Sequence, residues 1–252
     1  MDPQTPQEFI LEAFADPASV RDVVKGILHT IFFHRFFPSV APRSREVLDI
    51  TLPYVGDAEL DTMIEKRADE LAQQLDAERS SSSGGSKTAA GDSRGESAQA
   101  GGGRGGGGAG LGRGLPAAAA AAAGGGKGGG GRGTVTVQFF EKKRRKAWYG
   151  GRDEEVCWES WTLKVTVAEP RTESERAKVR NAMAQTLSAT VMKLVTCVNA
   201  HKDHIPPITT SEANPFPYQI HVNNPGGGVG VGGTDGVAAP PGAGWTTRMG
   251  IY

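Results

Sequence analysis

The chain has 252 residues, with 28 Lys and Arg against 28 Asp and Glu, so its formal net charge at pH 7 is zero. This balance excludes a global electrostatic attraction to nucleic acid or acidic membrane, although local clusters of charge remain possible. Most of the 36 glycines lie in one block between Ser80 and Gly133. Without that block about 200 residues remain, which is the size of one domain.

Compartment signals are those of a cytoplasmic protein. The two cysteines, Cys157 and Cys197, lie far apart in apolar sequence and are interpreted as reduced, buried residues. The N-terminus lacks the basic and apolar regions of a signal peptide, and no apolar run approaches the ~20 residues of a membrane span. We therefore expect a cytoplasmic chain without a membrane span.

The first predicted element is a helix over residues 17–37, bounded by Pro17 and Pro38. His29 and His34 lie within it, and no cysteine or carboxylate is spaced to complete a metal site, so both are interpreted as structural histidines. The apolar residues recur at helical spacing, at Val20, Val23, Val24, Ile27, Leu28, Ile31 and Phe32.

A strand and a second helix follow. Residues 46–52 alternate apolar and polar side chains, which predicts a strand with one face in water. Residues 57–78 predict a helix with Asp57 as its N-cap. Its apolar stripe consists of Leu60, Met63, Ile64, Leu71 and Leu75.

Residues 80–133 form a Gly/Ser/Ala-rich block that we expect to be a disordered insert, because it has almost no large apolar side chain. Its GGSKT segment at 84–88 lacks the residue order, preceding strand and following helix of a phosphate loop, and is rejected as one. Its Arg-Gly spacing has no interleaved aromatics for stacking on RNA bases, which favours a surface loop.

Residues 134–167 predict two strands with an exposed loop between them. Both ends alternate as half-buried strands do, and Trp161 shares a face with the apolar Leu163, whereas Trp158 is expected on the opposite face. The loop carries two large aromatics, Trp148 and Tyr149, followed by two glycines. Before them stands a basic run of five residues, Lys142, Lys143, Arg144, Arg145 and Lys146.

The remaining sequence predicts a long helix, one more strand and a flexible arm. Thr172 and Glu175 form a capping box that opens a helix over 172–202. His201 and His204 near its end make an incomplete metal site and are interpreted as a solvated helix terminus. Residues 216–222 alternate as a strand, and residues 223–244 are a Gly/Pro-rich flexible insert.

This order of elements predicts an α+β fold in which helices cover a sheet. The common motifs of nucleophilic and zinc-dependent catalysis, Gly-x-Ser-x-Gly and His-Glu-x-x-His, do not occur in the sequence. We therefore expect neither catalysis nor a cofactor or metal.

Several separated blocks resemble the autophagy-related protein 101 family, which comprises HORMA-domain proteins of the autophagy-initiation complex. The resemblance lies in GILHTIFFHR at 26–35, in FFEKKRRKAW and CWESWTLKVTV between 139 and 167, and in TESER at 172–176. It covers residues 7–79 and 134–222 in order, and omits the two Gly-rich blocks.

The resemblance implies a single HORMA domain over 1–252, with an antiparallel sheet, three helices packed on one face and a C-terminal mobile arm. It implies a non-catalytic adaptor that pairs with the HORMA domain of autophagy-related protein 13 and supports the initiating kinase complex at the phagophore assembly site. The family's exposed Trp-Phe finger, which recruits downstream factors, falls on Trp148 and Tyr149. The family pattern is Trp-Pro-Phe, so here the second ring is polar-tipped and one residue nearer.

Two interpretations of the basic run at 142–146 remain open. It is either a solvated loop that keeps the aromatic pair exposed, or a site for acidic lipid or nucleic acid. The second possibility, together with the Arg-Gly tract, defines the alternative function of a nucleic-acid-associated or chromosomal HORMA protein.

Overall fold

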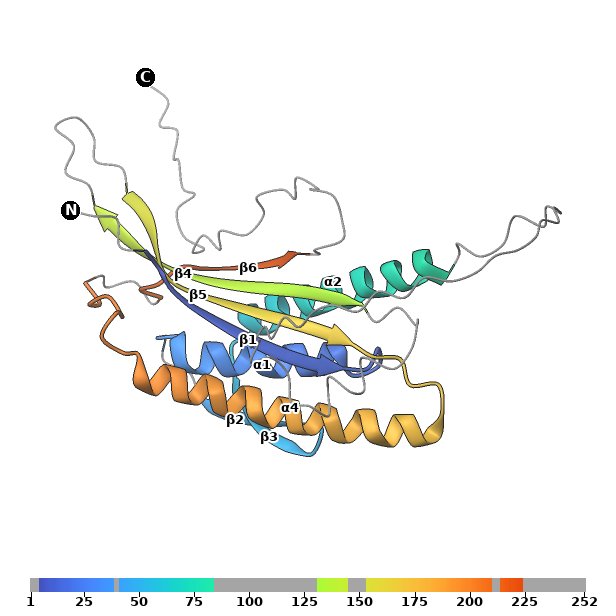
Figure 1. Ribbon diagram of the computed structural model, residues 1–252. Helices are drawn as coiled ribbons and strands as arrows, with labels where there is room; N and C mark the ends of the chain where they lie inside the picture. Colours follow the sequence, from blue (N-terminus) through green and yellow to red (C-terminus); the bar gives the residue numbers. More distant parts are fainter. Residues whose placement is uncertain (1–4, 39–40, 84–130, 145–152, 210–213, 224–252) are drawn as a thin grey trace, which may run out of the picture.

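The computed structural model describes residues 5–38, 41–83, 131–144, 153–209 and 214–223 (Figure 1). Within these residues the chain forms helices α1, α2 and α4 and strands β1 to β6. The bounds in chain order are β1 Gln7–Ala15, α1 Val20–Arg35, β2 Pro42–Val47, β3 Ile50–Val55, α2 Ala58–Ser83, β4 Arg132–Arg144, β5 Asp153–Val167, α4 Glu173–Ala200 and β6 Tyr218–Asn223.

A four-stranded sheet in the order β1-β5-β4-β6 is the centre of the fold. β4 runs antiparallel to both β5 and β6, whereas β1 runs parallel to β5. The sheet is therefore mostly antiparallel, and the predicted antiparallel arrangement does not extend to β1. Strand β1 itself was not predicted from the sequence, although Phe9, Leu11 and Ala13 alternate as its buried face.

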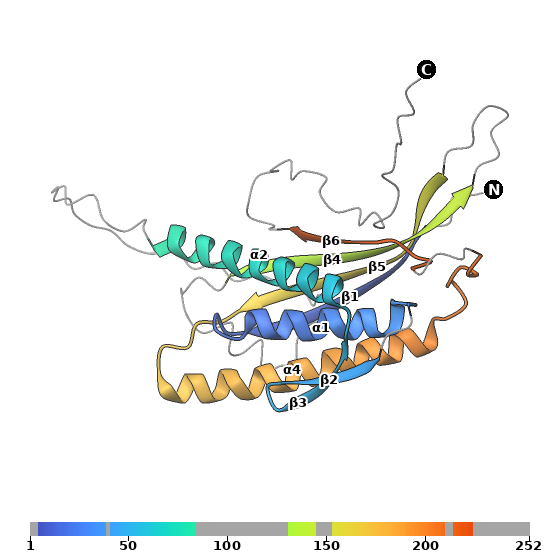
Figure 2. The same ribbon diagram turned by 180° about the vertical axis from the view of Figure 1, so that it is seen from behind.

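Helices cover one face of this sheet (Figures 1 and 2). Along β4 and β5 the odd-numbered residues are buried, from Val135 to Phe139 and from Glu159 to Val167. Phe32 of α1 packs edge-on against Phe139 with ring centroids 5.4 Å apart. Helix α2 approaches β4 so closely that a Cβ on Gly133 would lie 2.5 Å from a methyl group of Leu71. A side chain at position 133 would therefore require Leu71 to shift.

Helix α4 begins as its capping box predicts and then closes one edge of the sheet. The Thr172 hydroxyl accepts from the Glu175 N–H at 3.2 Å, and the Glu175 carboxylate accepts from the Thr172 N–H. Farther along the helix, the Lys193 ammonium donates to the carbonyl of Ile10 at 2.7 Å, and the Thr190 hydroxyl donates to the carbonyl of Glu12. These contacts occupy backbone acceptors that an edge strand otherwise leaves open.

The predicted single strand over 46–52 is wrong, because the chain reverses in its middle. β2 and β3 form a hairpin whose turn residues, Leu48 and Asp49, have φ angles of 51° and 62°. Two left-handed residues are what a tight two-residue hairpin requires, and Asn-Gly is the usual sequence signal for them. Here the turn carries Leu-Asp, so the signal was absent, and Leu48 packs partly buried against the core.

The ends of the predicted Gly-rich insert belong to regular elements. Helix α2 continues to Ser83 and β4 begins at Arg132, so residues 80–83 and 132–133 are helical and extended. Residues 84–130 lie outside the described residues, as do 224–252, which include nearly all of the predicted second insert and arm.

Candidate functional site at the base of a two-stranded extension

At one end of the sheet, β4 and β5 continue past their neighbours. β1 pairs with β5 only from Glu159 onward, and β6 pairs with β4 only as far as Phe139. Residues 140–144 and 153–157 therefore form a strand pair that lies beyond the four-stranded sheet, here called the extension. Figure 1 shows it rising away from the helices at the end where α1 finishes.

The charges of the extension lie opposite one another across the two strands. In the β4–β5 register Lys142 is opposite Glu155, and Lys143 is opposite Glu154. Opposite charges in such positions stabilise a strand pair by about 0.2–1 kcal/mol each. The Lys143 ammonium also lies 3.2 Å from a carboxylate oxygen of Glu141 on its own strand. The part of the basic run that the structure describes is thus balanced by neighbouring acids.

A β-bulge marks the junction between sheet and extension. Phe139 is paired with Glu159 and Phe140 with Cys157, so Trp158 is the extra residue. The prediction that Trp158 faces away from the core is wrong, since the bulge breaks the strict alternation of β5. Its ring is 7% exposed and lies near Phe139, Phe216 and His204, at centroid distances of 5.9, 5.2 and 5.6 Å.

The neighbouring Glu159 is a fully buried carboxylate that receives three side-chain donors. Arg35, the last residue of α1, donates through Nε to both oxygens at 2.8 and 2.9 Å. Nε2 of His204 lies 2.6 Å from Oε2, and Nε1 of Trp161 donates to Oε1. We call these four residues the Glu159 cluster. A carboxylate with no exposure to water requires such complete pairing, because an unpaired charge is strongly destabilising in a protein interior.

The Glu159 cluster joins segments that are remote in sequence. Arg35 also donates to the backbone carbonyl of His201, at 3.4 Å, so the end of α1 and the segment after α4 are held together. Phe9 of β1 stacks on Trp161 with ring centroids 4.3 Å apart. The prediction of a solvated helix terminus is therefore wrong for His204, which binds a buried carboxylate. That carboxylate lies 45 residues away, which no local spacing reveals.

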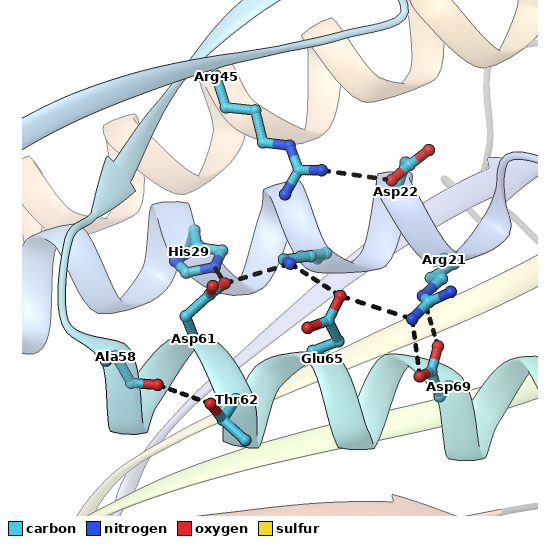
Figure 3. Close-up of polar contacts among 10 residues, drawn as sticks. Arg21, Asp22, His29, Arg45, Ala58, Asp61, Thr62, Glu65 and Asp69 are labelled. Carbon is cyan, nitrogen blue, oxygen red and sulfur yellow. Dashed lines mark hydrogen bonds and ion pairs between the residues drawn. The ribbon is translucent and has the colours of Figure 1, made fainter.

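A second polar cluster lies between α1 and α2 (Figure 3). The ammonium of Lys25, whose side chain is 8% exposed, lies 3.2 Å from Asp61 and 3.4 Å from Glu65. His29 Nε2 lies 3.2 Å from Asp61, and the His29 ring packs on the ring of Tyr54 at 4.1 Å. Toward the start of α1, Arg21 pairs with Asp69.

Burial lowers the pKa of His29 to about 4, although its contact with Asp61 acts in the opposite direction. The imidazole is therefore neutral at pH 7, and Nε2 carries the proton that it donates to Asp61. Hydrogen bonds from Tyr54, Lys25 and His29 lower the pKa of the Asp61 carboxyl, against the effect of its own desolvation. His29 is thus held by a carboxylate from another helix, a partner that local spacing in the sequence does not reveal.

The predicted contact residues fall at and beyond the end of the extension. Lys142, Lys143 and Arg144 are the last residues of β4. The other four, Arg145, Lys146, Trp148 and Tyr149, lie outside the described residues. The two cysteines are free and half-buried, and burial raises the pKa of the Cys157 thiol.

In the part of the chain that the structure describes, no three His, Cys, Asp or Glu residues are grouped as metal ligands. None of the helices in the same part is long and apolar enough to cross a membrane. The polar groups that are present in the two clusters bind one another across element boundaries.

The fold and the site together define a mixed α+β domain, whose described residues place three helices against a mostly antiparallel sheet that extends as a strand pair at one end. A family model described as autophagy-related protein 101 matches residues 12–212. The protein of that name from Schizosaccharomyces pombe is 24% identical over 200 residues, which are 79% of this chain and 77% of the yeast protein.

The corresponding protein of Arabidopsis thaliana is 19% identical over 236 residues, covering 86% of this chain and 84% of its own. That of Xenopus tropicalis is 30% identical over 76 residues, which are 30% of this chain and 34% of the frog protein. The family model spans most of the chain, and the chain belongs to the autophagy-related protein 101 family.

Proposed function

We propose that this protein is a non-catalytic adaptor of the autophagy-initiating kinase complex, located in the cytoplasm and at the phagophore assembly site. It pairs with the HORMA domain of autophagy-related protein 13 and recruits downstream factors through Trp148 and Tyr149. The observation that supports this function best is the extension. Its two strands lead out of the sheet into residues 145–152, the stretch that contains both aromatic residues, in a chain of the autophagy-related protein 101 family.

Aromatic residues at such a position have a physical reason to bind a partner. A tryptophan ring that enters a pocket removes about 150–250 Å² from water, which is worth ~4–6 kcal/mol before the costs of association are subtracted. Aromatic anchors of this kind carry much of the binding free energy in protein interfaces. The two strands of the extension support the segment 145–152, which contains both rings.

The test of the finger is the full-length double variant Trp148→Ala/Tyr149→Ala, expressed as the sole copy in cells. We expect recruitment of downstream factors to be lost while the melting temperature changes by no more than about 1–2 °C, as for surface substitutions. The matched control is Phe33→Ala, because Phe33 is an aromatic residue of α1 that is 39% exposed. Normal recruitment by the double variant, or a loss of several degrees, would contradict the proposal.

Pairing is tested separately, by co-purification of the full chain with the HORMA domain of autophagy-related protein 13. A stable complex in equal proportions is expected, and its absence at micromolar concentrations overturns this part of the proposal. The nucleic-acid alternative predicts salt-dependent binding of RNA or DNA. The acids opposite Lys142 and Lys143 disfavour it, and a steep fall of affinity with salt would reinstate it.

A further inference from the structure

The bulge and the Glu159 cluster occupy the same place in the fold. The last row of the four-stranded sheet passes through Glu159 on β5 and Phe139 on β4. The next residue of β5 toward the extension is Trp158, the extra residue of the bulge. A bulge bends its strand and increases the local twist, so the direction of the extension is determined at this row.

His204 contacts both residues of β5 at this junction. Its Nε2 atom lies 2.6 Å from the Glu159 carboxylate, and its ring packs against the Trp158 ring at 5.6 Å. His204 belongs to the segment between α4 and β6, which is also joined to α1 through the Arg35 contact with the His201 carbonyl. Figures 1 and 2 show this segment at the end of the molecule from which the extension rises.

The strand neighbours alone leave the extension weakly constrained. Among the described residues, one backbone hydrogen bond joins the extension to a segment other than β4 and β5. The Phe140 N–H donates it to the carbonyl of Pro217 at 2.8 Å. Isolated two-stranded hairpins are marginally stable and twist more strongly than wider sheets. Side-chain packing at the bulge must therefore select one direction.

We propose that Glu159 and His204 are positioning residues that fix the angle between the extension and the sheet. Glu159 anchors the last row to α1 through Arg35, and His204 holds the post-α4 segment against Trp158, the bulge residue next to that row. Removal of the His204 contact frees Trp158 to change rotamer, and the extension then samples several directions. The inference rests on the proposed function, in which the extension leads to the residues that bind partners. A binding segment that is held in one direction loses less entropy when it binds.

The test is hydrogen exchange on the full-length protein, compared among His204→Leu, His204→Gln and His29→Leu. His204→Leu removes the donor to Glu159, and His204→Gln keeps a donor near the position of Nε2. His29→Leu is the matched control, because His29 also contacts a carboxylate, at 3.2 Å from Asp61, but lies between α1 and α2. The amides compared are those of 140–144 and 153–157, against those of 135–138 in the four-stranded sheet.

In His204→Leu we expect the extension amides to exchange about tenfold faster than in the unmodified chain, without an equal change in 135–138. His204→Gln should restore much of the protection, and His29→Leu should leave the extension unchanged relative to the sheet. The inference is overturned if His204→Leu leaves the extension unchanged, or if His29→Leu accelerates it equally.

This experiment needs no partner, so its outcome is independent of the proposed function. Faster exchange confined to the extension in His204→Leu, together with normal recruitment by the Trp148→Ala/Tyr149→Ala variant, would support the positioning role. The same pair of results would overturn the proposed function of Trp148 and Tyr149. Unchanged exchange together with lost recruitment would do the reverse.

Discussion

The two polar clusters of this domain both pair acidic with basic side chains, but they differ in which charges they bury. In the Glu159 cluster both the carboxylate and its Arg35 partner are inaccessible, with side chains 0% and 3% exposed. In the α1–α2 cluster the ammonium of Lys25 is buried, whereas Asp61 and Glu65 remain 31% and 47% exposed. Water therefore solvates the acids of the α1–α2 cluster. It does not reach the Glu159 carboxylate, which depends entirely on its protein partners.

The consequences of losing one partner therefore depend on whether water can replace it. A buried ion pair contributes little beyond apolar side chains of the same size, yet it is costly to break on one side. A half-exposed pair exchanges its partner for water at small cost. Substitutions at Glu159, His29 and Arg21 test this difference.

Glu159→Leu should lower the free energy of unfolding by about 3–5 kcal/mol, because it leaves the Arg35 guanidinium buried without a counter-charge. Urea unfolding of the full-length protein measures the loss. The double variant Arg35→Met/Glu159→Leu should recover most of it, since neither charge then remains in the interior. A double variant as unstable as the single one would show that shape, and not charge, determines the cost.

His29 gives the second effect, through pH. Its pKa is about 4 in the folded chain, against the ordinary histidine value of 6.5, so as pH falls below 6.5 the unfolded chain takes up a proton that the folded chain refuses. Stability therefore falls between pH 6.5 and 4 by up to about 3 kcal/mol from this group, and is unaffected by it above pH 7.

The variant His29→Gln keeps a donor to Asp61 and should flatten this pH dependence in urea unfolding measured from pH 4 to pH 7. His221→Gln, at an exposed histidine of β6, serves as control and should keep the slope of the unmodified chain. An unchanged slope in His29→Gln would mean that His29 is protonated in the folded protein.

The sequence could predict those parts of the structure that depend on contacts between neighbouring residues. Helix α4 was predicted to within two residues at each end, because its capping box and periodicity are local. The sequence predicts residues 142–144 as part of a loop, because they are consecutive charges. In the structure they belong to a strand, since acidic residues of β5 lie opposite them after the chain reverses. The mirrored order of basic 142–144 and acidic 153–155 was the available signal.

The clusters themselves depend on contacts that no local pattern carries. Arg35 and Glu159 are 124 residues apart, and His29 and Asp61 are 32 apart on different helices. A glutamate within the apolar strand of Trp158 and Trp161 could have been singled out as a buried charge in need of a cation. Which cation supplies the pairing follows only from the packing of α1 against the sheet.

The smallest effect is expected at the exposed edge of the α1–α2 cluster. Arg21→Ala removes contacts to Asp69 at 2.5 Å and Glu65 at 3.5 Å, but the Arg21 side chain is 48% exposed and water replaces it. We expect a loss below about 1 kcal/mol that shrinks further at high salt. Arg176→Ala on α4, whose side chain is 64% exposed, is the control for a pair within one helix. A loss above about 2 kcal/mol for Arg21→Ala would mean that Glu65 needs Arg21 to stay on Lys25, and the two clusters would then be alike in their cooperativity.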